Sequence, residues 1–186
     1  MNKNPSTDVI TRQTWLDPAA DVVQKTTLNA FEKAGSAGRK IEDVLRGKWL
    51  GHPLHAALID VPLGAWTTAV LLDAVESSTG REELRPGADA AIGIGLVGAI
   101  GAAVTGLTDY QHVQGSARRV GIVHGILNVV TLSCFTASYI SRKRHSRTLG
   151  KFWGAAGFAI GMFAATLGGE MVYNLKVGVK DARIAA

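Results

Sequence analysis

The sequence has a single cysteine, five prolines and few aromatic residues in 186 positions. One cysteine, Cys134, excludes an intramolecular disulfide and a metal site built from several thiolates. It lies among apolar residues, and we interpret it as a small buried hydrophobic side chain. No serine or cysteine stands in a motif that indicates a nucleophilic triad. The sequence therefore favours a protein that is not an enzyme by itself.

Charge is missing from three long stretches of the chain. Residues 90–108 and 152–169 contain no charged side chain, and residues 120–141 contain only His124 as a potentially charged group. A helix needs about 20 largely apolar residues to cross the hydrocarbon core of a bilayer. A fourth apolar stretch begins at Leu54, and Pro62 predicts a kink in it.

The sequence thus predicts an all-α fold, a four-helix transmembrane bundle. The spans lie at about residues 54–73, 90–108, 120–141 and 152–173. A soluble bundle would show a polar stripe on each helix, and these stretches have none. Small residues recur at helical spacing instead, in two rows formed by Ala91, Gly95, Ala99 and Ala103 and by Gly157, Gly161, Ala165 and Gly169. Such rows permit close helix packing in lipid and are faces through which an oligomer can form.

The chain is divided into an N-terminal arm, residues 1–48, a membrane domain, residues 49–180, and a tail, residues 181–186. In the arm, Asp17 and Pro18 predict the N-cap and first residue of an amphipathic helix that lies along the lipid headgroups. The glycine-containing run at residues 35–38 predicts a break, followed by a second short amphipathic piece.

The net charge of +5 resides outside the apolar stretches. This placement suits anionic lipid headgroups, whereas a nucleic-acid binder needs a basic folded face with base-stacking residues. We therefore expect membrane lipid as a partner and no nucleic acid. No signal peptide is evident, so we expect the first span to direct insertion into the bacterial inner membrane as a multi-pass protein. Lysine and arginine are slightly more frequent on the face of the termini, which favours cytoplasmic termini.

Polar side chains gather at one end of the predicted bundle. Four antiparallel spans bring the starts of the first and third helices and the ends of the second and fourth to the same face. The residues placed there are His52, His55, Asp60, Asp109, His124, Asn128 and Glu170. Ionisable groups that face lipid cost roughly a few kcal/mol or more, so we expect these side chains to form a buried polar cluster.

Two interpretations of the histidines stay open. His55 and His124 on facing helices, with His52 nearby, can serve as ligands for a b-type haem or a metal. Alternatively, His52 is an N-cap residue before Pro53, and the other histidines hydrogen-bond neighbouring acids and amides to hold the helices together.

Asp60 lies about 9 Å deeper than Leu54 by helical rise. It is either a structural partner of other polar groups or a carrier of protons or small solutes. The run Arg142-Lys143-Arg144 is interpreted as charge that flanks the membrane and has no further role.

The block Trp49-Leu50-Gly51-His52-Pro53-Leu54-His55, followed by Ile59-Asp60-Val61-Pro62-Leu63-Gly64-Ala65-Trp66, resembles the signature of an uncharacterised family of predicted bacterial membrane proteins, a domain of unknown function. Residues 106–110, 118–124 and 168–173 resemble later blocks of the family. The resemblance implies a four-helix membrane domain, sometimes joined in one chain to a Rieske-type iron–sulfur module. Members often carry His-Gly where this chain has Leu175 and Lys176, which removes that histidine as a ligand here.

The site residues and the family resemblance together leave three functions open. The first is a structural anchor or assembly partner of a membrane redox complex, whose Rieske-type or other redox protein is a separate chain, because one cysteine cannot ligate such a cluster. The second is an electron-transfer subunit that binds haem or metal through His55 and His124. The third is proton or small-solute transfer through Asp60.

Overall fold

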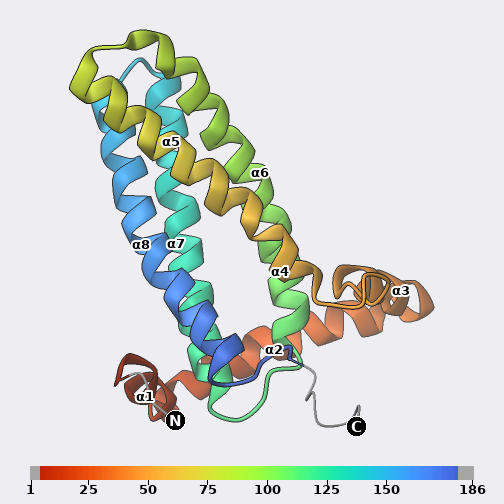
Figure 1. Ribbon diagram of the computed structural model, residues 1–186. Helices are drawn as coiled ribbons and strands as arrows, with labels where there is room; N and C mark the ends of the chain where they lie inside the picture. The colour runs from red at the N-terminus through yellow and green to blue at the C-terminus, as the bar shows by residue number, and fades with distance from the viewer. Residues whose placement is uncertain (1–4, 180–186) are drawn as a thin grey trace, which may run out of the picture. The chain divides into compact units, whose positions relative to one another are not determined.

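The computed structural model describes residues 5–179 of the chain (Figure 1). The described residues are almost entirely helical and include no strand, which confirms the predicted all-α class. Helical segments long and apolar enough to cross a membrane are Leu54–Thr79, Glu82–Tyr110, Ala117–Lys143 and Arg147–Tyr173. Each contains one of the predicted spans. The predicted tail, residues 181–186, lies outside the described residues.

The helices, in chain order, are α1 (Pro5–Thr11), α2 (Asp17–Lys33), α3 (Gly35–Leu45), α4 (Leu54–Leu58), α5 (Asp60–Thr79), α6 (Arg85–Tyr110), α7 (Ala117–Lys143) and α8 (Arg147–Tyr173). Single turns of 3-10 helix precede α2 and α6. The long helices extend several residues beyond the predicted windows. Apolar windows mark the hydrocarbon core, whereas backbone hydrogen bonding continues into the polar ends of a helix.

The chain forms two compact units. Of the described residues, unit 1 comprises those up to Leu54, Thr105–His124 and those from Ala165 onward, and unit 2 comprises His55–Val104 and Gly125–Ala164. Helices α6, α7 and α8 contribute segments to both. Each unit has its own apolar core, the first around Tyr110, Leu16 and Ile122 and the second around Trp66, Ile92 and Phe135.

In unit 2, segments of α5, α6, α7 and α8 pack around an aromatic pair. Trp66 stacks on Phe135 with ring centroids 4.0 Å apart and planes inclined by 7°. Gly95 of α6 lies against the tryptophan, since a Cβ at this position would be 2.2 Å from Trp66 Nε1. A Cβ on Gly157 of α8 would be 3.0 Å from Phe135 Cδ2. Members of both small-residue rows therefore pack against helices of the same chain, and oligomerisation through these rows stays a prediction.

The first span is interrupted at Ile59, between α4 and α5. Pro62 explains the interruption because it has no backbone N–H to donate to the carbonyl of Leu58, four residues earlier. Pro62 is buried against α6, where a Cβ on Gly98 would lie 3.0 Å from Pro62 Cδ. Ile59 itself keeps helical dihedral angles, and a change of helix direction at this point stays a prediction.

In unit 1, the start of α2 differs from the prediction. Asp17 is the first residue of α2, the N-cap position is held by Leu16, and no side chain caps the helix. The prediction that Asp17 is the N-cap is wrong, because its carboxylate accepts hydrogen bonds from the Arg119 guanidinium.

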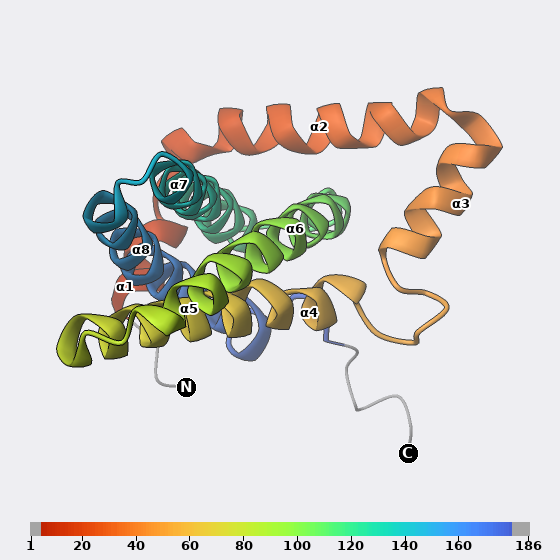
Figure 2. The same ribbon diagram turned by 90° about the horizontal axis from the view of Figure 1, so that it is seen from above.

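The break predicted at residues 35–38 lies earlier in the structure, at Ala34 between α2 and α3. The chain turns sharply between α2 and α3 (Figure 2), and α3 already begins at Gly35, which has a φ of 60°. Gly38 lies inside α3 because the helix passes close to α2, where a Cβ on Gly38 would be 2.0 Å from the carbonyl oxygen of Phe31. Two of the glycines thus permit the turn and the close approach.

Candidate functional site

The predicted polar residues are distributed over both units. Unit 1 holds His52, Asp109, His124 and Glu170, and unit 2 holds His55, Asp60 and Asn128. The predicted haem or metal ligands His55 and His124 therefore belong to different units, and their pairing stays a prediction. Among the described residues, no group of three or more His, Cys, Asp or Glu side chains has the spacing needed to hold a metal ion.

The two acids of unit 1 have partners in the N-terminal part of the chain. Asp109 Oδ1 lies 3.8 Å from Arg46 Nε. Glu170 Oε2 accepts hydrogen bonds from Asn174 Nδ2 at 2.5 Å and from Thr7 Oγ1 at 3.4 Å. These contacts connect the N-terminal arm to the ends of α6 and α8.

The histidines differ in their surroundings. His52 is exposed two residues before the start of α4, with Nδ1 3.3 Å from the carbonyl oxygen of Pro53, so it does not cap α4 as predicted. His124 on α7 lies against α8, where a Cβ on Gly168 would be 3.1 Å from its ring atom Cε1. His55 Nδ1 lies 2.8 Å from the carbonyl oxygen of Ala102 on α6. A carbonyl only accepts hydrogen bonds, so Nδ1 of His55 carries a proton, and in the neutral ring Nε2 keeps its lone pair.

Asp60 is not turned inward. It is the first residue of α5 and is exposed, and its side chain forms no hydrogen bond or ion pair with any other described residue. The expectation that it belongs to a buried cluster is wrong, because Trp66 and Pro62 occupy the buried side of α5 and Asp60 lies on its exposed side. A side chain on the outer face does not favour a proton relay among these helices.

Sequence reasoning missed a cluster of charged side chains that joins the four helices of unit 2, here named the charge clasp. Its members are Asp73 and Glu76 of α5, Arg85 and Asp89 of α6, Arg142 of α7, and Arg147 and Lys151 of α8. Arg142 is its most buried member, with a side chain only 1% exposed.

The pairing within the charge clasp is dense. Arg142 Nη1 donates to Asp89 Oδ1 at 2.9 Å and to Asp73 Oδ1 at 3.1 Å, and Arg142 Nη2 donates to Asp73 Oδ2. Arg147 Nη2 donates to Asp73 Oδ1 at 2.8 Å, and Arg147 Nη1 donates to Asp89. Lys151 Nζ lies 2.9 Å from Glu76 Oε2. Each carboxylate of the charge clasp therefore has at least two cationic partners.

The remaining nitrogen of the central guanidinium is also paired. Arg142 Nε donates to Ser138 Oγ at 3.2 Å, and Ser138 Oγ donates to the carbonyl oxygen of Gly150 at 2.6 Å. Buried charges are costly unless they are paired and hydrogen-bonded. A cluster in which the charges neutralise one another is suited to fixing helix ends.

The interpretation of Arg142 as flanking charge without a role is wrong, although Lys143 and Arg144 are exposed as it expected. A signal for the charge clasp is present in the sequence. Acids follow the first apolar stretch and precede the second, while cations follow the third and precede the fourth. Antiparallel hairpins bring these four places to one face, so their opposite signs predict pairing.

A second set of ion pairs holds the N-terminal arm in unit 1. Arg119 Nε and Nη2 each donate to an oxygen of Asp17 at 2.8 Å, and Arg118 Nη1 donates to Asp21 Oδ1 at 2.5 Å. The hydrogen bonds from Arg119 hold the pKa of Asp17 below its usual value. A polar cavity of about 470 Å³ adjoins these pairs and is lined in part by Gln24, Arg118 and Arg119.

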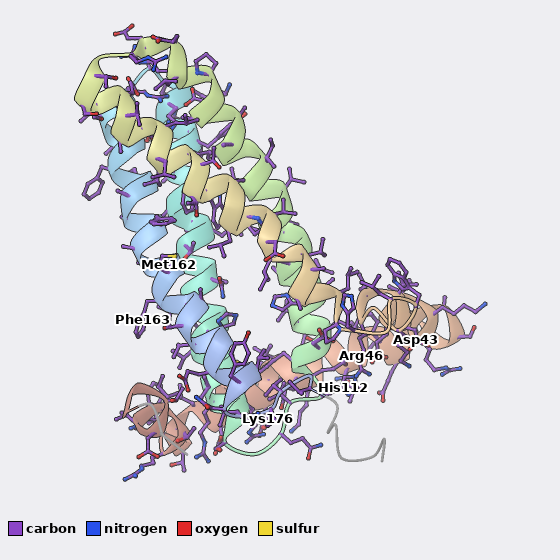
Figure 3. The ribbon with its side chains drawn as sticks, viewed as in Figure 1. Asp43, Arg46, His112, Met162, Phe163 and Lys176 are labelled. Carbon is purple, nitrogen blue, oxygen red and sulfur yellow. The ribbon has the colours of Figure 1, made fainter. Side chains whose placement is uncertain are left out.

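Farther along the arm, Glu42 of α3 contacts the segment that follows α6. Glu42 Oε1 lies 2.8 Å from His112 Nε2 and accepts a hydrogen bond from Gln111 Nε2 at 3.1 Å. Arg46 and His112 lie next to each other at this place (Figure 3). The arm is thus attached at both α2 and α3.

Comparison with known proteins gives one finding. A family model described as "Predicted membrane protein (DUF2231)" matches residues 51–181, which is more than half of the chain. Neither the curated proteins nor the solved structures contain a match. The matched region begins within the first block of the resemblance noted in the sequence and includes the four apolar helical segments and the charge clasp.

Proposed function

We propose that this chain, which belongs to the family of predicted membrane proteins DUF2231, is a structural anchor or assembly partner of a membrane redox complex. The charge clasp is the observation that carries the proposal. Its paired charges fix the ends of four membrane helices to one another, and a fixed set of helices offers a stable surface to another membrane subunit. The redox nature of the partner rests on the resemblance to proteins that are sometimes joined to Rieske-type modules.

The outer surfaces of the helices also support an anchoring role. Val97 of α6 is 73% exposed and Val129 of α7 is 64% exposed, and Leu71, Ile94 and Ile100 are exposed as well. Side chains of this kind on a membrane helix contact either lipid or the helices of another subunit.

The proposal is tested by native electrophoresis of membranes solubilised in mild detergent. Cells that carry a tagged chain are compared with cells that lack the chain, and redox complexes are detected by haem staining and by electron paramagnetic resonance of iron–sulfur clusters. We expect the tagged chain to migrate with such a complex and the complex to become less abundant without the chain. A chain that migrates alone, with all complexes unchanged in its absence, contradicts the proposal.

A matched pair of variants connects this assay to the charge clasp. We expect Arg142→Ala to lower the abundance of the complex, because the helix ends are no longer fixed. Arg144→Ala removes an exposed charge two residues away and should leave the complex intact. If both variants support assembly equally, the charge clasp does not carry the function.

A second candidate function is electron transfer through a b-type haem or a metal bound by His55 and His124. The contact between His55 Nδ1 and the carbonyl oxygen of Ala102, at 2.8 Å, favours it. Histidine ligands commonly donate one ring N–H to a carbonyl, which orients the ring and leaves the other nitrogen for the metal. Absorption spectra of the purified protein, oxidised and reduced, should then show a Soret band that His55→Ala and His124→Ala remove. Absence of both a Soret band and stoichiometric metal eliminates this candidate.

We also propose that the protein resides in the bacterial inner membrane with cytoplasmic termini. Arg39, Lys40, Arg46 and Lys48 lie in or just after α3, close in sequence to the first span. Basic residues beside a span favour the cytoplasmic side and anionic lipid. A fluorescent protein fused to the C-terminus should fluoresce, whereas alkaline phosphatase fused there should be inactive. The reverse pattern contradicts the orientation.

A further inference from the structure

The outer face of α5 carries an acid that no residue in the described part of the chain neutralises. Asp60 is exposed, lies about 9 Å deeper than Leu54 by helical rise, and forms no side-chain hydrogen bond or ion pair with another described residue. We propose that this face binds a transmembrane helix of another protein that carries a lysine or arginine at the depth of Asp60. The inference rests on the proposed function, since it assigns the surface through which the anchor contacts its complex.

The face around Asp60 permits a close approach by another helix. Ala57, Asp60, Gly64 and Thr68 recur at intervals of three or four residues, and all four are exposed. No atom lies within 4 Å of the position that a Cβ on Gly64 would occupy. Small side chains at this spacing let the backbones of two membrane helices come close together.

Charge decides which occupant fits this face. A carboxylate at membrane depth costs roughly a few kcal/mol against lipid, and a cation placed opposite it removes most of that cost. The chain itself shows this solution at the other end of α5, where Asp73 and Glu76 are paired with cations of α7 and α8. Asp60 is the acid of α5 that has no cationic partner among the residues that the structure describes.

A second copy of this chain does not meet the requirement. Residues 49–80, 86–117, 120–141 and 152–175 contain no lysine or arginine, so no span of a second copy offers a cation at the depth of Asp60. The occupant is therefore a different protein, and its distinguishing feature is a basic residue within a transmembrane helix.

Site-specific photocrosslinking in living cells tests the inference. A benzoylphenylalanine residue replaces Thr68, two turns from Asp60 on the same face, and in a control it replaces Val97 on α6. We expect Thr68 to yield an adduct with a membrane protein whose crosslinked span contains a lysine or arginine, identified by mass spectrometry. Asp60→Asn should lower the yield of that adduct about tenfold, the effect of losing about 1.4 kcal/mol, while adducts from Val97 stay unchanged.

Charge reversal then provides the decisive measurement. Asp60→Lys should abolish the adduct, and replacing the partner's cation by aspartate should restore it in the Asp60→Lys background. Equal abundance and equal native migration of purified wild type and Asp60→Asn establish that the exposed substitution leaves the fold intact.

Several outcomes overturn the inference. They are adducts only with lipid, adducts with a second copy, a partner span without a cation, or a yield that Asp60→Asn does not change. The inference alone fails if the chain migrates with a redox complex while Thr68 gives one of these results. Both the inference and the proposed function fail if the chain also migrates alone and all complexes are unchanged without it.

Discussion

Arg142 illustrates how strongly the role of a charged residue depends on whether its side chain points into the protein or away from it. It stands beside Lys143 and Arg144 in a basic run, yet its guanidinium points into unit 2 and the two neighbours are exposed. All three guanidinium nitrogens donate hydrogen bonds, to Asp73, Asp89 and Ser138. Its loss would leave carboxylates partly unpaired in a poorly solvated site, which costs more than the loss of an exposed charge.

We predict that Arg142→Ala destabilises the purified protein by about 3 kcal/mol or more. The free energy of unfolding is measured in mixed detergent micelles with increasing mole fraction of dodecyl sulfate. Arg144→Ala is the control and should change the unfolding free energy by less than about 0.5 kcal/mol, as exposed substitutions usually do. Similar losses in the two variants would show that the charge clasp contributes little to stability.

A second prediction at this scale concerns the glycines of α6. A Cβ on Gly95 would be 2.2 Å from Trp66 Nε1, whereas a Cβ on Gly93 would be at an ordinary 3.7 Å from Tyr139 Cε2. Gly95→Ala should therefore displace Trp66 from its stack with Phe135 and cost about 1–3 kcal/mol of stability. Gly93→Ala should be neutral or slightly stabilising. The same micelle titration, with tryptophan fluorescence as its signal, distinguishes the two variants.

At the scale of elements, the N-terminal arm is attached by ion pairs that respond to pH. Hydrogen bonds from Arg119 lower the pKa of Asp17, so the folded protein holds this carboxylate ionised more strongly than the unfolded chain does. By linkage, this contribution to the docking of α2 is fully present above the usual pKa of an aspartate and is lost as the pH falls through the lowered folded-state value.

Hydrogen exchange of the α2 amides, corrected for intrinsic rates, measures this docking. We predict that protection of α2 is constant near neutral pH and declines below about pH 4. Asp17→Asn should reduce protection at neutral pH and weaken its dependence on pH. Asp43→Asn, which removes a pair with Lys48 within the arm, should leave α2 as in the wild type. An unchanged exchange profile in Asp17→Asn would refute the electrostatic account of docking.

The elements that the sequence predicts well are those with local causes. The four spans follow from apolar length, and the break at Ile59 follows from Pro62. The start of α2 and the location of the turn before α3 depend on tertiary contacts, Arg119 with Asp17 and Gly38 with Phe31, which no local pattern contains. Tertiary packing also determines which side of α5 is buried. Trp66 and Pro62 pack inward, and Asp60 is therefore exposed.

For the molecule as a whole, exposure of apolar side chains on the long helices implies a lipid surround. Val97 on α6 is 73% exposed, and Val22 on α2, outside the spans, is 65% exposed. We predict that Val97→Lys impairs membrane insertion by about 2.5–3.5 kcal/mol, the cost of a central lysine in a span. Val22→Lys should have little effect. The fraction of protein that resists alkaline carbonate extraction measures both variants, and equal fractions would contradict a membrane location for α6.

The candidate sites show the same division between local and tertiary causes. Ionisable residues within apolar stretches identified His55 and Asp60, since any such residue is conspicuous there. The charge clasp was missed because its members stand at the edges of those stretches, where charge is expected. Only the pairing of opposite signs across α5, α6, α7 and α8 distinguishes Asp73 and Arg142 from ordinary flanking charge.

The distribution of the charge clasp along the chain sets an order for biosynthesis. Asp73 and Asp89 leave the ribosome before Arg142 and Arg147, so the first helical hairpin enters the bilayer with these two acids not yet neutralised, whereas Glu76 already has Arg85 of the same hairpin as a partner. Unpaired carboxylates are costly in lipid, so we expect the first hairpin to stay at the insertion machinery until the second hairpin has been synthesised. Ribosomes stalled before residue 142 should therefore yield a fragment that membrane proteases remove, whereas chains extended past residue 151 escape.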